Sequence, residues 1–167
     1  WKRDVHFQTN TTIDTLYYSG TGLNAGSKVV IAAVGKAKRV LGAEKPSIDF
    51  PTSVLNFSVA FPGVLAIQLT SFSNYEQEKT LIKQLERILI PFSEALQSFP
   101  LLLICDDCDF VSRSFSNMIW STFTRSNPSH DIYGVDEFTE FKHWGCKSSL
   151  IIDCRMEPHN APYLELD

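Results

Sequence analysis

The chain has 167 residues, 44% of them hydrophobic and 12% aromatic, which is enough for one well-packed core and short for two ordinary domains. Its formal net charge is -4 and no run of Lys or Arg stands out, which argues against a nucleic-acid-binding protein. The longest apolar stretch, residues 101–105, has the length of one strand, so no segment has the composition of a membrane-spanning helix.

The two ends and the cysteines bear on the setting of the protein. The first residue is Trp1 rather than Met, and neither end resembles a signal peptide, so we expect a piece of a longer protein. The cysteines are too few for a disulfide-held mini-domain and fall in or beside apolar segments: Cys105, Cys108, Cys146 and Cys154. We therefore expect a reducing, cytoplasmic location.

Strands dominate the first part of the chain. Residues 5–18 are rich in β-branched and aromatic side chains and predict one or two strands, followed by a glycine-rich loop over residues 19–27. Residues 28–35 form a nearly continuous apolar run, which predicts a buried strand. A surface connection is predicted over residues 36–53, because Pro46 and Pro51 interrupt it.

Two short strands and the clearest helix come next. The strands are predicted over residues 56–61 and 63–69, with Pro62-Gly63 as the turn between them. Ser73 and Glu76 fit a capping box at the start of a helix. Apolar side chains then recur at helical spacing, although Pro91 predicts a kink or two consecutive helices: Leu81, Leu85, Ile88, Leu89, Phe92 and Leu96.

Strands and helices alternate over the rest of the chain. Residues 99–105 predict a buried strand, and residues 114–125 a second helix that ends before Asn127-Pro128. The last strands are predicted over residues 131–135 and 149–154. Together these elements predict an α/β fold with a mixed β-sheet flanked by helices in α/β/α layers, and a strand-rich N-terminal part.

The pair Cys105-x-x-Cys108 has the spacing of a redox site or of half a zinc site. The aspartates between the thiols disfavour the redox interpretation, because negative neighbours raise a thiol pKa. Cys105 and Cys108 could bind zinc together with His143 and Cys146. The favoured interpretation is that both thiols are incidental, since free cysteines are usually buried.

An acidic cluster follows directly after the strand at residues 99–105: Asp106, Asp107 and Asp109. Such carboxylates could bind a hard cation, pair with an arginine, or cap the next helix. Arg125 ends the following helix, where a cation suits the helix dipole, and we favour a structural ion pair for it. On the same helix, Trp120 is expected in the core.

These residues carry a resemblance to a known family. A strand followed by acidic residues, a helix ending in Ile-Trp-x-x-x-Thr-Arg, and then Pro and Asp resembles the C-terminal domain of the UbiD family, the 3-polyprenyl-4-hydroxybenzoate decarboxylases. Ser121 stands where alanine is usual, Cys108 falls inside the acidic cluster, and Asp153 comes at a slightly longer spacing than usual. The matching residues are Asp106, Asp107, Asp109, Ile119, Trp120, Thr124, Arg125, Pro128, Asp131, Gly145, Lys147 and Asp153.

The resemblance implies a carboxy-lyase that decarboxylates an aromatic acid in quinone biosynthesis, either ubiquinone or menaquinone. It implies prenylated FMN, with Mn2+ and K+, in the full-length protein, and a UbiX-type flavin prenyltransferase as the supplier of that cofactor. The catalytic arginine and carboxylates of the family belong to the preceding domain, so no catalytic, cofactor-binding or metal-binding residue is expected in this chain.

The same resemblance divides the chain and gives it a role. Residues 1–35 would continue from a missing flavin-binding region, and residues 36–167 would form the C-terminal domain. That domain would support a homo-oligomer and line the substrate cleft, with Phe99 as a candidate lining residue, and would be inactive alone. The alternative hypothesis is a free-standing zinc-binding or protein-interaction module.

Overall fold

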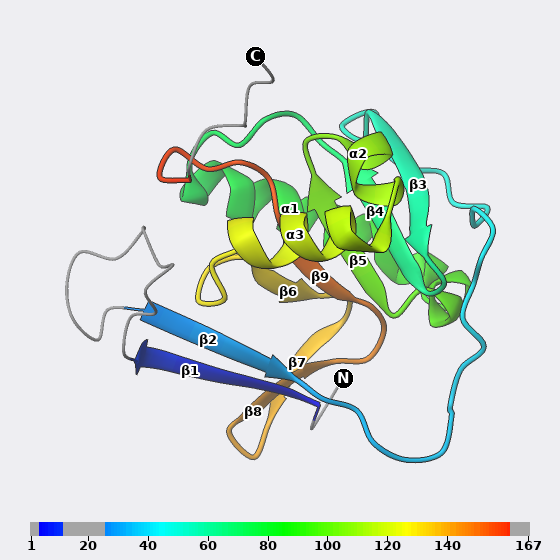
Figure 1. Cartoon of the computed structure of the whole chain (residues 1–167). Helices are drawn as coiled ribbons and strands as arrows, with labels where there is room; N and C mark the ends of the chain where they lie inside the picture. Colours follow the sequence, from blue (N-terminus) through cyan, green and yellow to red (C-terminus); the bar gives the residue numbers. More distant parts are fainter. Residues whose placement is uncertain (1–3, 12–25, 161–167) are drawn as a thin grey trace.

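The computed structural model describes residues 4–11 and 26–160 and is built on one five-stranded sheet (Figure 1). The parallel strands β4 (Val64–Gln68), β5 (Leu101–Cys105) and β9 (Leu150–Asp153) form its centre. The antiparallel strands β3 (Asn56–Phe61) and β6 (Ile132–Gly134) form its edges, in the order β3-β4-β5-β9-β6. The predicted mixed sheet is confirmed.

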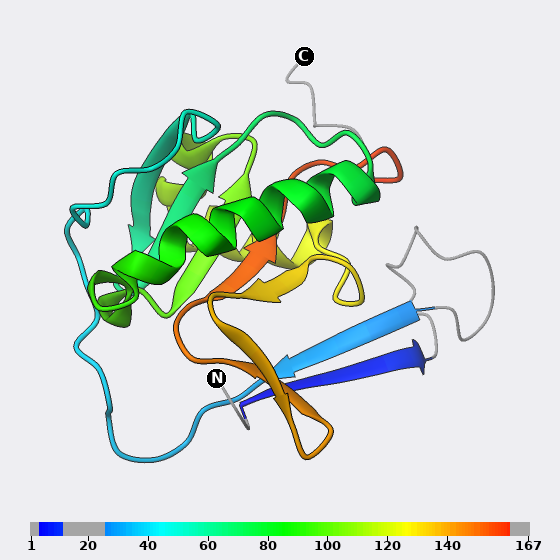
Figure 2. The ribbon, with the colours of Figure 1, turned by 180° about the vertical axis from the view of Figure 1, so that it is seen from behind.

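Helices cover both faces of this sheet, as Figures 1 and 2 show from opposite sides. The helix α1 (Tyr75–Leu89) lies on one face and is followed by the 3-10 turns η1 (Ile90–Phe92) and η2 (Ala95–Ser98). The helices α2 (Cys108–Ser112) and α3 (Phe115–Arg125) lie on the other. The α/β/α layering predicted from the sequence is therefore confirmed.

Two buried clusters fill the spaces between the sheet and its helices. Alternate residues of each central strand face opposite layers: Leu102 and Ile104 pack with α1, whereas Leu103 packs with α2 and α3. Because both faces are covered, side chains on both sides of a central strand are buried, which explains the continuous apolar run of β5 at residues 101–105.

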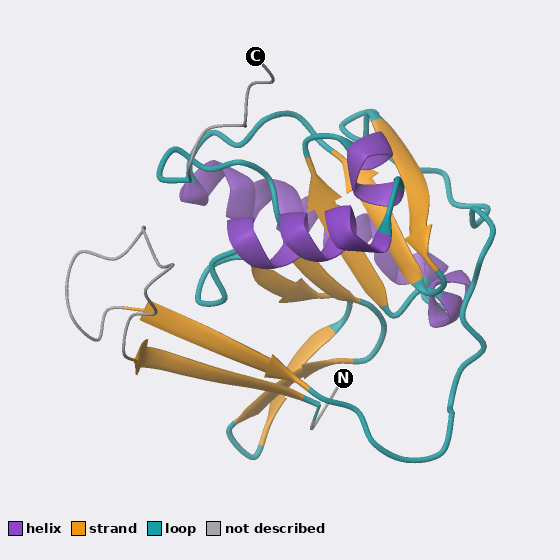
Figure 3. Cartoon of the chain, viewed as in Figure 1, coloured by secondary structure: helices purple, strands orange, loops and turns teal. Residues whose placement is uncertain are grey.

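Two smaller antiparallel pairs lie beside the main sheet (Figure 3). They are β1 (Val5–Thr11) with β2 (Gly26–Ile31), and β7 (Glu137–Glu140) with β8 (His143–Cys146). The rest of the predicted first strand and the glycine loop, residues 12–25, lie outside the described residues.

The prediction of a buried strand over residues 28–35 is wrong. The strand β2 begins at Gly26 and ends at Ile31, Val30 is 59% exposed, and Val34 lies beyond the strand and is fully exposed. The reason is that β2 pairs with β1 in a two-stranded sheet instead of joining the five-stranded one. An apolar run is typical of a buried strand only when helices cover both of its faces.

The helix α1 begins one residue later than its predicted capping box. Asn74 is the cap residue, and its side chain accepts a hydrogen bond from the backbone N–H of Gln77 at 3.1 Å. The backbone N–H of Ser73 donates instead to Glu78 Oε1 at 2.9 Å. Of the predicted apolar stripe, Leu85, Leu89 and Leu96 are buried as expected. The stripe leaves out Ile82, which is also buried, and includes Ile88, which is exposed.

The other predicted elements are confirmed within a few residues. The helix breaks at Pro91 into two 3-10 turns, and Pro62-Gly63 forms the turn before β4, with Gly63 at φ +81° where glycine is favoured. The helix predicted over residues 114–125 is α3, with Ser114 as its cap. Sequence reasoning missed α2 and the β7–β8 hairpin. Among the described residues, no helix combines the length and apolar character that crossing a bilayer requires.

The cap assignment gives a first testable prediction. Asn74→Ala is expected to lower the free energy of unfolding by about 1 kcal/mol, because the N–H of Gln77 loses its acceptor. Ser73→Ala is the matched control and should cost less, since the Ser73 side chain contacts only exposed polar groups. Urea unfolding of both variants decides the matter; an equal or larger cost for Ser73→Ala would place the cap at Ser73.

Candidate functional site

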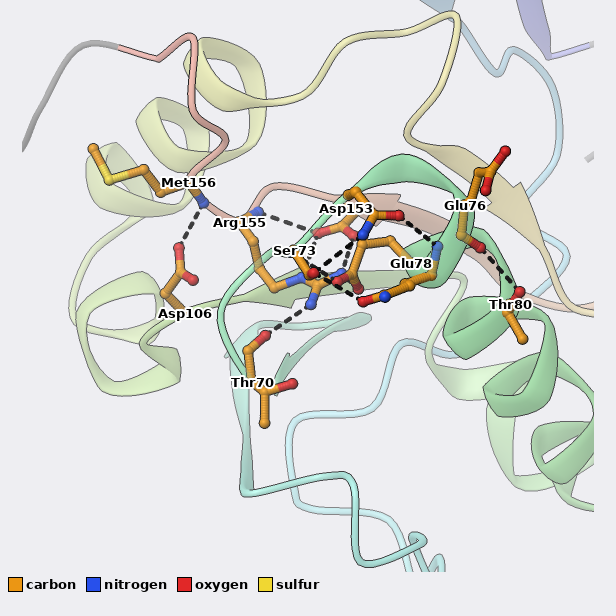
Figure 4. Close-up of polar contacts among 11 residues, drawn as sticks. Thr70, Ser73, Glu76, Glu78, Thr80, Asp106, Asp153, Arg155 and Met156 are labelled. Atoms are coloured by element: carbon orange, nitrogen blue, oxygen red, sulfur yellow. Dashed lines mark hydrogen bonds and ion pairs between the residues drawn. The ribbon is translucent and has the colours of Figure 1, made fainter.

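Polar residues gather where the parallel strands end. Thr70 follows β4, Asp106 follows β5, and Arg155 follows β9, so all three lie at the carboxyl edge of the sheet. The helix α1 begins at this edge and contributes Tyr75 and Glu78, as Figure 4 shows for Glu78. In open α/β sheets this edge is where ligands and catalytic groups collect, so it is the candidate functional site.

Arg155 is the centre of this edge, and its side chain is fully buried. Its Nη2 donates to Asp153 Oδ2 at 2.6 Å and to Glu78 Oε2 at 2.5 Å, and its Nε donates to Asp153 Oδ1 at 3.0 Å (Figure 4). Its Nη1 donates to the backbone oxygen of Thr70 at 2.7 Å. One guanidinium therefore ties together the ends of β4 and β9 and the first turn of α1.

The acidic cluster after β5 separates into different roles. Asp106 Oδ2 accepts a hydrogen bond from the N–H of Met156 at 2.7 Å and lies 3.5 Å from Arg125 Nη1. Asp107 caps α2, because its Oδ1 accepts from the N–H groups of Asp109 and Phe110 at 2.9 Å each. Asp109 is exposed in the first turn of α2, where a negative charge suits the helix dipole.

A third group of polar residues lies next to Arg155. Asp131 is 2% exposed and accepts a hydrogen bond from the N–H of Asn127. Tyr75 Oη donates to Glu157 Oε2 at 2.5 Å, and His159 Nδ1 lies 3.3 Å from the same oxygen. Burial, and then the charge of Glu157, raise the pKa of Asp131 well above its ordinary value.

A shallow hollow opens beside this group. Its volume is about 380 Å³, and Tyr75 on its wall contacts the ring of His130 with the centroids 4.7 Å apart. The phenol–carboxylate pair of Tyr75 and Glu157 also lines the hollow and can hydrogen-bond a polar ligand. The hollow is lined by Phe72, Ser73, Asn74, Tyr75, Glu157, Pro158 and His159.

The zinc hypothesis is wrong. Cys105 Sγ faces the backbone oxygen of Ile67, Cys108 Sγ faces the side chain of Gln68, and Cys146 Sγ faces the backbone of Ser149. The described part of the chain contains no group of three or more His, Cys, Asp and Glu side chains that could hold a metal ion. The same finding argues against a hard-cation site at the acidic cluster of Asp106, Asp107 and Asp109. The physical reason is that Cys105 ends a buried strand, whereas His143 and Cys146 lie on the β7–β8 hairpin.

The structure brings only some of the family-matching residues together. Asp106, Arg125, Asp131 and Asp153 lie at the carboxyl edge. Other matching residues lie elsewhere. Pro128 is half-buried in the turn after α3, and Gly145 is buried in β8. Lys147 pairs with Asp136 at 3.0 Å on the surface, and three further matching residues are exposed: Asp109, Trp120 and Thr124.

Two aromatic residues lie away from the carboxyl edge. The prediction that Trp120 lies in the core is wrong, since it is 44% exposed; its ring lies 4.9 Å from the Arg125 guanidinium, and the inner face of α3 is formed by other residues. Phe99 is 2% exposed and belongs to the core under α1, just before β5. It therefore lies at the amino edge of the sheet, where it also borders a second shallow hollow with Gly42.

Sequence reasoning missed Tyr75, Glu78, Arg155 and Glu157. The signal for Arg155 was present, because it lies two residues after the end of β9, much as Asp106 lies directly after β5. No local signal marks Glu78, whose partner Arg155 is 77 positions away along the chain.

Arg125 gives a second testable prediction. Arg125→Ala is expected to lower the free energy of unfolding by about 1–3 kcal/mol, because Asp106 loses its ion-pair partner. The Arg125 side chain is only 8% exposed, so the pair is largely buried. Arg113→Ala, which removes an exposed arginine from the end of α2, is the matched control. Unchanged melting of the Arg125→Ala protein would contradict a structural role for this residue.

Among the similar proteins described below, one has a name that states a function. The chain matches a protein of Chlamydia pneumoniae that is named as a subunit of 4-hydroxybenzoate decarboxylase, with 29% identity over 99% of the chain. It also matches uncharacterized proteins of Chlamydia trachomatis and Chlamydia caviae, with 28% and 26% identity over 99% of the chain. The chain spans only 26% of the length of each of these relatives. No family model matches the chain, and no solved structure matches it.

Proposed function

We propose that this chain is the C-terminal domain of a UbiD-like decarboxylase that acts on an aromatic acid in ubiquinone or menaquinone biosynthesis. The observation that carries the proposal is the match over 99% of the chain to a protein named as a 4-hydroxybenzoate decarboxylase subunit. The motif residues from Asp106 to Asp131 support it from the sequence side. Because the chain spans 26% of that relative, the reaction itself is assigned to the rest of the full-length enzyme.

The proposed domain division follows a break in the architecture. The strands β1 and β2 form their own two-stranded sheet, and an irregular segment separates β2 from the first strand of the five-stranded sheet. Residues 1–35 are proposed to lead in from the flavin-binding region, and residues 36–167 to form the C-terminal domain.

The proposed cofactor is prenylated FMN with Mn2+ and K+, supplied through a UbiX-type flavin prenyltransferase. The described residues of this chain do not fit that metal, because they contain no group of three or more potential ligands. At the carboxyl edge, Asp153 and Glu78 are already engaged by Arg155, and Asp106 by Arg125. We propose that the cofactor and the acid–base residues lie in another part of the full-length enzyme, and that this enzyme is cytoplasmic.

The domain's own share in this proposal is structural. The network around Arg155 joins the ends of two strands and one helix beneath the surface at the carboxyl edge. The hollow beside Tyr75 and Glu157 lies on that surface and is the part of the domain that we assign to the wall of the substrate cleft. The assembly role is assigned to the outer helices.

A decarboxylation assay tests the proposal. The full-length gene product, co-expressed with a UbiX-type prenyltransferase, is incubated with 4-hydroxybenzoate, its polyprenyl derivative or a small phenolic acid, and CO2 release is measured. We expect release by the full-length protein and none by the 167-residue chain, which is the matched control. A full-length protein that holds prenylated flavin and decarboxylates none of these acids would overturn the proposal, as would activity of the chain alone.

A further inference from the structure

The hollow beside Tyr75 offers a ligand a buried hydrogen-bond acceptor. Tyr75 Oη donates to Glu157 Oε2 at 2.5 Å, so the carboxyl group of Glu157 already acts as an acceptor. His159, another residue that lines the hollow, has its Nδ1 3.3 Å from the same oxygen, so a polar group in the hollow can approach it. Glu157 is only 4% exposed, and a hydrogen bond to it therefore forms with little competition from water.

The same hollow is unsuited to a negatively charged group. None of the lining residues that the structure describes is Lys or Arg. The guanidinium of Arg155 lies 5.9 Å from the ring of Phe72 on the wall, but each of its three nitrogens already donates within its own buried network. Asp131, next to Glu157, adds a second buried carboxyl group. A carboxylate that entered the hollow would therefore meet like charges without a cation to bind it.

The remaining walls suit an aromatic ring. The rings of Phe72 and Tyr75 lie edge to face with their centroids 5.2 Å apart, and Pro158 adds apolar surface beside them. Edge-to-face and offset contacts are the arrangements that a further ring prefers. The volume of about 380 Å³ lies within the range of small-molecule sites, about 300–1,000 Å³. The hollow can thus hold the end of an aromatic ring that carries a hydrogen-bond donor.

We propose that this hollow binds the phenolic hydroxyl group of the aromatic acid, which donates a hydrogen bond to Glu157. The carboxylate of the acid then points out of the hollow, towards the part of the full-length enzyme that carries out the decarboxylation. Glu157 is a specificity-determining residue in this arrangement, because an acid without the hydroxyl group leaves its acceptor unused. The inference rests on the proposed function and deepens it, since it restricts the substrate to phenolic acids.

The affinities of two matched acids test the proposal. 4-Hydroxybenzoate and 4-methylbenzoate share the ring and the carboxylate and are similar in size, but only the first can donate a hydrogen bond. Binding is measured by calorimetry on the full-length protein expressed without the prenyltransferase, so that neither acid is turned over. We expect 4-hydroxybenzoate to bind at least ~10-fold more tightly, the usual effect of a hydrogen bond to a charged group.

Glu157→Gln is expected to reduce this preference to about 3-fold or less, because a neutral acceptor forms a weaker hydrogen bond than a carboxylate. Glu76→Gln is the matched control, since Glu76 is exposed in the first turn of α1 and does not line the hollow. Circular dichroism establishes that the variants are folded. If Glu157→Gln unfolds, Glu157→Asp replaces it, because it withdraws the carboxylate by one methylene and should also reduce the preference.

Equal affinities of the unaltered protein for the two acids, or binding of neither, would overturn the proposal. A preference that both Glu157 variants retain would overturn it as well and place the hydroxyl site elsewhere. The decarboxylation assay fails independently of this one. A preference that depends on Glu157 without CO2 release would support the hydroxyl site and overturn the proposed function, whereas CO2 release without a hydroxyl preference would do the reverse.

Discussion

Arg155→Met is expected to lower the free energy of unfolding by about 3–5 kcal/mol, the largest effect of any single substitution considered for this chain. The Met side chain fills a similar volume but leaves Asp153 and Glu78 as buried, like-charged carboxylates without their common partner. It also frees the backbone oxygen of Thr70, which accepts a hydrogen bond from Arg155 Nη1. Breaking a buried ion pair on one side costs far more than the pair contributes, because the remaining charge stays desolvated.

The measurement is urea unfolding, with Lys147→Met as the matched control. Lys147 and Asp136 form an ion pair at 3.0 Å with both side chains largely in solvent, so its loss should cost less than about 1 kcal/mol. Arg155→Lys should fall between the two, because an ammonium keeps the charge but cannot bind Asp153 and Glu78 with the planar fork of a guanidinium. Equal stability of the Arg155→Met and Lys147→Met proteins would contradict the role given to Arg155.

The second large effect is a pH dependence that comes from Asp131. Its pKa is raised from 3.8 to about 9 in the folded protein, by burial and by the charge of Glu157. Between these values the folded chain keeps a proton that the unfolded chain releases, so the stability contribution is complete at low pH and is lost as the pH rises towards 9. The slope reaches at most about 1.4 kcal/mol per pH unit for one proton.

Asp131→Asn should remove most of that slope. The asparagine oxygen can still accept the hydrogen bond from the N–H of Asn127, and the side chain is neutral at every pH. Urea unfolding at a series of pH values measures the slope, and Asp109→Asn, at an exposed carboxylate, is the matched control. A wild-type stability that does not fall between about pH 5 and pH 9 would show that Asp131 is ionised in the folded state.

The central layer of the fold was predictable because burial leaves a direct mark on the sequence. The strands β5 and β9 are covered on both faces, so β5 is a continuous apolar run and β9 is apolar up to Asp153 at its end. The helix α3 was found from Ser114 at its start and from Asn127-Pro128 after its end. Peripheral elements carry weaker signals: α2 has five residues, too few for helical periodicity, and the β7–β8 hairpin has strands of four residues each.

What failed depends on contacts that the local pattern does not contain. The apolar run that includes Val30 and Val34 predicted burial, but no helix layer covers β2 among the described elements. Trp120 was expected inside because large aromatic residues usually are, whereas α3 turns its polar residues and Arg125 inward to meet Asp106. A surface helix with an apolar outer face violates the usual rule, and such violations are expected where a protein has a functional surface.

Part of the candidate site, the pair of Asp106 and Arg125, could be predicted from the sequence. The strand-end rule points to Asp106 and the helix-end rule to Arg125, and the fold brings the two together at 3.5 Å. The Arg155 network joins residues from β4, α1 and β9, and its members acquire their roles only through the tertiary fold. Within this network only Arg155 left a signal in the sequence, by its place after β9, and Glu78 left none, so their pairing could not be assigned from the sequence.

The central claim, that this chain is one domain of a longer decarboxylase, is tested most directly by the mass of the native gene product. Antiserum raised against the chain is used to blot an extract of cells that carry the gene naturally. The proposal predicts a band several times heavier than 18.9 kDa, in keeping with relatives of which the chain spans 26%. A single band at 18.9 kDa would mean that the chain works alone, and the assignment to a decarboxylase would fall.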